Sequence, residues 1–262
     1  MVYSVEMEGA GTVEIQGTPP EARQPNKFFT DVKNLIELNV INVDEEGNAD
    51  IEGRIEDWEM RFNGDTIAGK SMTSSGVETP IVERMKQPFR MRISKYGEML
   101  GFEGELVERD LFPFNAVGEK RGWTAALPPH PVKVGDTWAE DLPPFFQPVD
   151  ENTKPQIHYS LAGFETIKGL ECAVIETWMD ESDIRPGESD FSIPGFSGMI
   201  SKFSSFTQSM EGKLYFAHQA GVLIGFEFAM SQAGDMEISF SADSEPMKMK
   251  LNLEINGVVN LE

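Results

Sequence analysis

Residues 222–230 of this chain read VLIGFEFAM, and this stretch decides the fold class because its apolar residues recur at every second position. A repeat of two is that of a β-strand, in which successive side chains point to opposite faces of the sheet. The same spacing continues on both sides of the stretch, at Leu214, Phe216, Met236, Ile238, Phe240, Met247, Met249, Leu251, Leu253 and Ile255. Consecutive strands in the C-terminal third are therefore predicted to present one apolar face.

Short turn-like segments separate these runs, at 218–221, 231–235 and 241–246. Loops of this length join antiparallel neighbours. The N-terminal part repeats the pattern, with predicted turns at 9–11, 44–48 and 95–98, and a further pair of strands is expected to meet at 168–169. Apolar residues recur at three and four only at Met199, Ile200, Phe203 and Phe206, which predicts a short helix between positions 198 and 208.

Residues 111–144 are rich in proline and lack periodicity, so they are expected to form a connector that interrupts the sheet. Within the connector, Gly135 and Asp136 predict a tight turn, and Trp138 is expected to anchor it. The chain is predicted to be one β-rich domain, 1–262, with sub-halves at about 1–110 and 145–262. The predicted fold is all-β and mainly antiparallel: a curved half-barrel or open barrel of about ten strands, with short helices or loops on the concave side.

Charge and composition exclude several classes of partner. The 262 residues include 22 Lys and Arg against 44 Asp and Glu, a formal net charge of −22. Such a charge repels nucleic acid and anionic membrane surfaces, and no apolar run is long enough for a membrane-spanning helix. Acidic residues such as Glu6 and Glu8 alternate with Val5 and Met7, so the charge is expected to mark the solvated face of the sheet.

The connector and the strands that follow it resemble a known group of proteins. Residues Pro131 to Trp138 read PVKVGDTW, and a strand pair follows in which Tyr159, Leu161, Gly163 to Ile167 and Gly169 fit the same pattern. Together with 212–216 and 221–223, these residues resemble a group of uncharacterised bacterial envelope proteins, some of them predicted lipoproteins. The resemblance implies a fold similar to the bacterial lipoprotein carriers and mycobacterial lipid-carrying lipoproteins, in which a curved half-barrel has a covered apolar concave face. The chain differs from the carriers in lacking clear lid helices and a basic face.

No sequence motif points to catalysis or to a cofactor. The three histidines, His130, His158 and His218, lack local partners at metal-ligand or triad spacing, and the common nucleophile and phosphate-binding motifs are absent. The single cysteine, Cys172, is better explained as a buried hydrophobe than as a nucleophile. Residues 44–50 offer oxygen ligands of the kind calcium accepts, but a solvated hairpin tip explains them better. The protein is therefore predicted not to be an enzyme and to bind neither cofactor nor metal.

Methionine and phenylalanine on the apolar face supply the candidate binding residues, because unbranched thioethers adapt to ligands of varied shape. The candidates are Met199, Phe203, Phe206, Met210, Phe226, Phe228, Met230, Met236, Phe240, Met247 and Met249. They either form an ordinary core or line a groove for a hydrophobic ligand.

Our leading hypothesis is a non-enzymatic envelope protein that binds a lipid or acyl chain on its concave face. The alternative is a structural or protein-interaction module that uses a sheet edge or its acidic face, and a hydrolase whose residues converge only in space ranks third. The first residues lack an export signal, which leaves a cytoplasmic protein or the mature part of an exported one.

Overall fold

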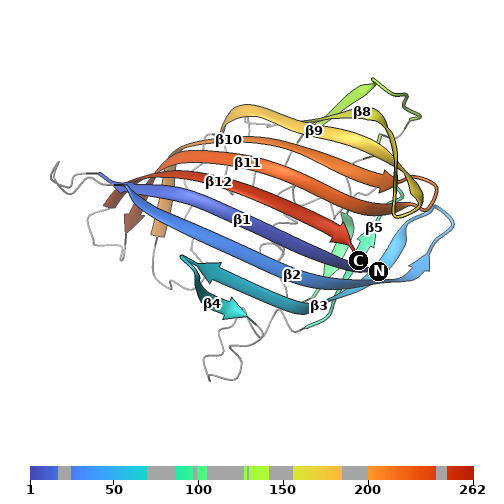
Figure 1. Ribbon diagram of the computed structural model, residues 1–262, viewed down its shortest axis with the longest axis horizontal. Coiled ribbons are helices and arrows are strands. Elements are labelled where there is room, and N and C mark those ends of the chain that lie inside the picture. Colours follow the sequence, from blue (N-terminus) through green and yellow to red (C-terminus); the bar gives the residue numbers. More distant parts are fainter. Residues whose placement is uncertain are drawn as a thin grey trace.

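The computed structural model describes residues 1–16, 25–69, 87–96, 99–104, 127–128, 130–141, 156–184, 200–239 and 247–262. Every regular element in these residues is a strand, and the strands form one antiparallel, open sheet, which confirms the predicted fold class (Figure 1). The strands are β1 (Val2–Ile15), β2 (Asn26–Val43), β3 (Ala49–Phe62), β4 (Asp65–Gly69), β5 (Phe89–Ile93), β6 (Met99–Glu103), β7 (Thr137–Asp141), β8 (Gln156–Ile167), β9 (Leu170–Ile184), β10 (Ile200–Ala217), β11 (Val222–Ser239) and β12 (Met247–Leu261).

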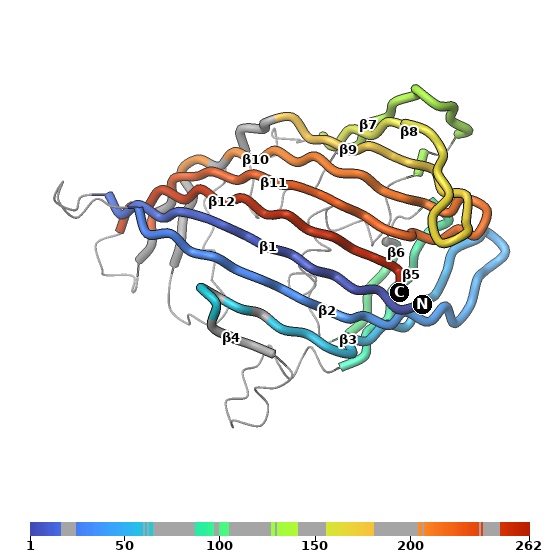
Figure 2. The backbone as a smooth tube through the Cα atoms, viewed as in Figure 1, coloured from blue at the N-terminus to red at the C-terminus, as the bar shows by residue number. Residues whose placement is uncertain are grey.

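The first and last strands meet in the middle of the sheet. The order across it is β6-β5-β3-β2-β1-β12-β11-β10-β9-β8-β7, and β4 pairs with β3 beside this path. Figure 2 shows β1 and β12 side by side, with both chain ends at the same end of the sheet. The N–H of Glu262 donates to the Val2 carbonyl at 2.9 Å, and the N-terminal ammonium of Met1 donates to the Leu38 carbonyl at 2.8 Å. The N- and C-terminal strands thus share one sheet.

Local turn chemistry confirms two predicted hairpins. Between β2 and β3, the Asp44 carboxylate accepts hydrogen bonds from the backbone N–H groups of Glu46 and Asn48, at 3.0 and 2.8 Å. Between β8 and β9, Lys168 and Gly169 both have positive φ, 51° and 79°. Two consecutive residues of this kind form the tight turn whose twist matches that of antiparallel strands. Both hairpins lie where the sequence predicts them.

Two other predicted turns are wrong, because the strands run through them. β1 continues through residues 9–11, and β11 continues through 231–235. Gly9 and Gly11 point into the sheet's apolar face, where Thr30 and the Phe28 ring occupy the space a side chain would need. In β11 the pairing with both β10 and β12 is unbroken across 231–235. Glycines that make room for a neighbour thus imitate the composition of a turn.

The predicted helix at 198–208 is also wrong, since residues 200–208 belong to β10. A β-bulge between Phe203 and Ser205 shifts the register against β11, so that Phe203 pairs with Met236 and Phe206 with Gly234. The partners of 203 and 206, Met236 and Gly234, are two apart in β11, although 203 and 206 are three apart in β10, because the bulge adds one residue to β10. The bulge therefore produced a helix-like spacing in an extended strand.

The predicted connector, 111–144, contains the edge strand β7, which pairs with β8. The expected turn before it is present: Gly135 has a φ of 92°, and the Lys133 N–H donates to the Asp136 carboxylate at 2.8 Å. The Gly135 N–H donates to the Leu161 carbonyl of β8 at 2.8 Å, which docks the turn on the sheet. Trp138 stacks on Tyr159 with ring centroids 5.5 Å apart, as its predicted anchoring role requires.

One face of the sheet carries the core. In the long strands of the sheet and in β5, alternate residues are buried on this inward face over part of each strand, and residues such as Glu6, Glu8 and Glu254 are exposed on the outward face. The prediction that acidic residues mark the solvated face is confirmed at these positions. A second, smaller cluster contains Cys172, Ala217 and Ile224.

Candidate functional site: the inward face of the sheet

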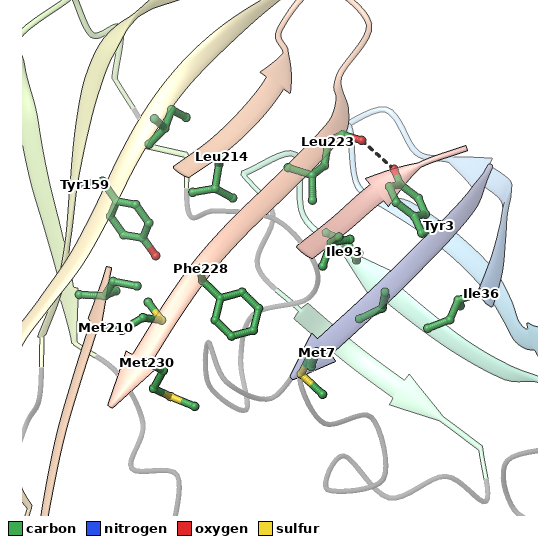
Figure 3. Packing of buried hydrophobic residues seen from close by; sticks show 14 of the residues in the cluster. Tyr3, Met7, Ile36, Ile93, Tyr159, Met210, Leu214, Leu223, Phe228 and Met230 are labelled. Atoms are coloured by element: carbon green, nitrogen blue, oxygen red, sulfur yellow. Dashed lines mark hydrogen bonds between the residues drawn. The ribbon is translucent and has the colours of Figure 1, made fainter. Parts of the chain in front are cut away.

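Three methionines form the centre of the candidate site. Met179 on β9, Met210 on β10 and Met230 on β11 are direct register partners across adjacent strands, and all three are buried. Figure 3 shows Met210 and Met230 close together, on the same side of the sheet as Phe228 and Tyr159. We call these three residues the methionine row. Its thioethers are flexible and polarisable, so this part of the face can adjust its shape.

The next row in register combines aromatic rings with glycines. Phe228 is the partner of Gly257 on one side and of Gly212 on the other. A Cβ atom at Gly257 would lie 2.3 Å from two ring atoms of Phe228, so the ring occupies the position of the missing side chain. Phe226 stacks on Phe228 with centroids 5.2 Å apart and also covers Gly212. The same arrangement recurs where the ring of Phe89 covers Gly53 and the ring of Phe28 covers Gly11.

On the other side of the methionine row lies a pair of buried glutamines. Gln208 on β10 and Gln232 on β11 are register partners, and both are inside the apolar face. The Gln232 Nε2 donates to Gln208 Oε1 at 3.4 Å and to Met230 Sδ at 3.5 Å. The Gln208 Nε2 donates to the same sulfur at 3.3 Å. Two amides thus meet a thioether, which is a weak hydrogen-bond acceptor.

A buried hydroxyl lies on the side of the methionine row away from the glutamine pair, in the same row as Phe228 and Gly212. Thr177 on β9 pairs with Gly212, and its side chain is 3% exposed. Its Oγ1 has no hydrogen-bond partner among the described residues. The inward face is therefore apolar overall, but it holds polar atoms whose hydrogen-bonding capacity is not fully used.

The structure brings some of the sequence-predicted residues together. Met210, Phe228 and Met230 belong to the main apolar cluster, and the partly buried Phe226 packs against it. Met247 and Met249 are half-buried near the start of β12. Positions 203, 206 and 236 lie in β10 and β11, but the described residues do not extend to their side chains, and Met199 and Phe240 lie outside them altogether.

Sequence reasoning missed Met179, Thr177, Gln208 and Gln232. A signal for the glutamines was present, because Gln208 is two residues from Met210 and Gln232 is two residues from Met230. Strand alternation puts each glutamine on the same face as its neighbouring methionine. The sequence did not show that the two glutamines are neighbours, because that depends on the register between strands.

Hollows on the outward face include two that are lined by residues of the described strands. The larger, of about 720 Å³, is lined mostly by outward residues of β1, β9, β10, β11 and β12. Its lining includes five glutamates, Glu6, Glu8, Glu176, Glu211 and Glu227, against one lysine, Lys213. A second hollow of about 440 Å³ shares Trp178 and Glu211 with it. This face is strongly negative.

The remaining candidates for chemistry are spread over the molecule. His158 stacks on Trp178, His218 lies 3.5 Å from a Glu171 carboxylate oxygen, and no cluster of three metal-ligating side chains occurs in the described ranges. Cys172 is buried, as predicted, and burial raises the pKa of its thiol. The Asp44 carboxylate binds its own turn and pairs with Arg92 at 2.5 Å, which is the structural role that a hairpin tip predicts.

No family model and no curated protein sequence matches this chain. Among solved structures it is similar to DynF from the dynemicin biosynthesis pathway of Micromonospora chersina, at 7% identity and a TM-score of 0.21, over 98% of this chain and 79% of that one. A chain from work on the asymmetric conductivity of engineered proteins matches at 7% identity and a TM-score of 0.27, over 99% of both chains. A mutant of the Rh. blastica porin matches at 8% identity and a TM-score of 0.26, also over 99% of both. At these TM-scores the likenesses carry no argument about function.

The described ranges contain no helix long and apolar enough to cross a membrane.

Proposed function

We propose that this protein binds a hydrophobic ligand, such as a lipid or acyl chain, on the inward face of its sheet, and that it does so without catalysis. The observation that carries the proposal is the methionine row: Met179, Met210 and Met230 lie side by side on three adjacent strands. Leucine or isoleucine would fill a fixed core equally well, whereas neighbouring thioethers can repack around molecules of different shape. Burial of an acyl chain would supply about 0.8 kcal/mol per methylene.

Binding would be tested first on the intact purified protein. Native mass spectrometry and solvent extraction should detect a co-purifying lipid, and titration with an apolar fluorescent probe should show saturable binding. A protein that carries no lipid and takes up no probe would refute the proposal.

A variant pair would then locate the site. Met210→Leu combined with Met230→Leu keeps side-chain volume but removes flexibility, so binding of the bulkier members of a ligand series should weaken about fivefold, equivalent to about 1 kcal/mol. The matched control is Met91→Leu, because Met91 is equally buried but lies on β5, which is not a neighbour of β9, β10 or β11 in the sheet. Equal effects of the two changes would place the ligand elsewhere.

The proposal includes a location in the cell envelope or outside the cell. It is supported by the resemblance of residues 131–169 to envelope and lipoprotein-like proteins. Fractionation of cells that express the native gene tests it directly, and recovery of the protein in the soluble cytoplasmic fraction alone would contradict it.

The outward face favours a second candidate function, as a protein-interaction module. The 720 Å³ hollow, with its five glutamates, suits a partner that presents lysine or arginine side chains. An oligolysine peptide should then bind with an affinity that falls as salt is added, and Glu211→Gln with Glu227→Gln should weaken it. Glu103→Gln, at an exposed position of the edge strand β6, is the matched control. Binding that is insensitive to salt would remove this candidate.

A further inference from the structure

The glutamine pair beside the methionine row has more hydrogen-bonding capacity than its surroundings use. Gln208 is 1% exposed and Gln232 is 7% exposed, so neither amide is solvated. The two amide groups carry four N–H bonds, and their acceptors among the described residues are the Met230 sulfur, contacted twice, and one amide oxygen at 3.4 Å. Buried polar groups normally find full-strength partners, so an exception of this kind calls for an explanation.

We propose that Gln208 and Gln232 hydrogen-bond a carbonyl oxygen of the bound ligand, which makes the ligand a neutral acyl ester or amide rather than a plain hydrocarbon. This inference rests on the proposed function and names the ligand class for the same face. A carbonyl oxygen accepts hydrogen bonds far better than a thioether does. A ligand carbonyl placed next to Met230 would therefore replace the two N–H contacts to its sulfur, while the acyl chain lies along the methionine row.

The charges around the glutamine pair favour a neutral ligand over a fatty-acid anion. The cross-strand neighbours of the pair are Leu253 beside Gln232 and Ser182 beside Gln208, and neither carries positive charge. Burial of a carboxylate without a cationic partner is strongly unfavourable, and the chain's net charge of −22 adds repulsion. A neutral carbonyl needs only the donors that the two amides already present.

The experiment compares three ligands on the intact protein by displacement of a bound fluorescent probe. Methyl octanoate carries the ester carbonyl, decane matches its chain length without it, and octanoate carries a charge instead. We expect methyl octanoate to bind about tenfold more tightly than decane, and octanoate to bind more weakly than the ester. Equal affinities for the ester and decane, or a preference for octanoate, would overturn the inference and leave the proposed function standing. If no ligand displaces the probe, both this inference and the proposed function are refuted.

Variants connect the preference to the two residues. Methionine has nearly the shape of glutamine but no N–H group, so Gln208→Met with Gln232→Met should bind ester and decane with equal affinity. Gln219→Met, at an exposed turn position between β10 and β11, is the matched control and should keep the wild-type preference. An ester preference that survives in the double variant would overturn the assignment.

Stability separates a binding role from a structural one. If the amides served to hold the fold together, the double variant would unfold at lower denaturant concentration than the wild type. If they serve the ligand, the variant should unfold at the same concentration or higher, because two poorly satisfied buried amides have been removed.

The side-chain amide resonances of the wild type give a third readout that needs no variant. They should shift with methyl octanoate and not with decane, and equal shifts would contradict the contact.

Discussion

Replacement of Gly257 by alanine should destabilise the sheet because the ring of Phe228 occupies the position of the new methyl group. The added Cβ would lie 2.3 Å from the Cε1 and Cζ atoms of that ring. The ring is itself in the core, with 7% of its residue surface exposed, so it cannot swing into solvent. Overpacking of a well-packed site costs about 1–3 kcal/mol, partly offset by the about 0.5–1 kcal/mol that alanine gains over glycine in a strand. We therefore expect a net loss of about 1–2 kcal/mol in the free energy of unfolding.

The control is Gly163→Ala on β8. Nothing lies within 4 Å of a Cβ at that position, and its backbone is not in the left-handed region. This substitution should leave stability unchanged or raise it by up to about 1 kcal/mol. Guanidinium unfolding monitored by tryptophan fluorescence and circular dichroism would measure both variants against the wild type.

A double-mutant cycle tests the reasoning itself. Phe228→Ala alone should cost about 3–5 kcal/mol through loss of the ring. In that background Gly257→Ala meets no ring, so its penalty should disappear, which gives a coupling energy of about 1–3 kcal/mol. If Gly257→Ala costs the same with and without the ring, the ring does not fill the space above the glycine, and the explanation is wrong.

Three further predictions concern single buried or bonded groups. Burial raises the pKa of Tyr3 from 10.0 to about 12, and its hydroxyl donates to the Leu223 carbonyl at 3.2 Å (Figure 3). Burial penalises ionisation of this hydroxyl, so it causes no loss of stability below the ordinary tyrosine pKa, and the free energy of unfolding falls by up to about 3 kcal/mol, at 1.36 kcal/mol per pKa unit, as pH rises toward 12. Unfolding of Tyr3→Phe should therefore depend less on alkaline pH. Hydrogen bonds from Asn48 hold the pKa of Asp44 below its ordinary value. The stability that these bonds contribute is therefore present above the ordinary pKa and is lost as pH falls through the lowered pKa. Acid unfolding of Asp44→Asn should lack this loss of stability. Thr177→Val removes a buried hydroxyl with no partner among the described residues and should raise the free energy of unfolding by about 1 kcal/mol in denaturant titrations; a loss would show that the hydroxyl is bonded.

The all-β class could be predicted because period-two alternation is a local property of each strand. Turn chemistry was equally local at Asp44 and at Lys168–Gly169, and both hairpins are where the sequence predicts them. Local composition misled wherever a neighbouring strand decides the outcome. Gly9 and Gly11 look like turn residues until Thr30 and Phe28 are seen to fill their space, and the spacing at 203 and 206 looks helical until the bulge is known.

The candidate site shows the same limit. Alternation within single strands was enough to identify Met210, Phe228 and Met230 as inward residues. It could not bring Met179 beside Met210, or Gln208 beside Gln232, because these neighbours come from different strands and depend on register. Register follows from the packing of the whole sheet, to which bulges such as the one between Gln208 and Met210 on the β9 side contribute.

The inward face thus contains two kinds of row that should respond differently to substitution. The rings over Gly257 and Gly212 fill their space completely, so changes there should alter stability. The thioethers of the methionine row can repack, and the amides of the glutamine pair are incompletely hydrogen-bonded, so changes there should alter ligand preference. The two sets of variants should therefore separate: Gly257→Ala should lower the unfolding free energy while the ester preference persists, and the double glutamine variant should lose the preference while stability persists. If both sets changed both properties together, the face would be one uniform core, and the assignment of a distinct ligand row within it would have to be abandoned.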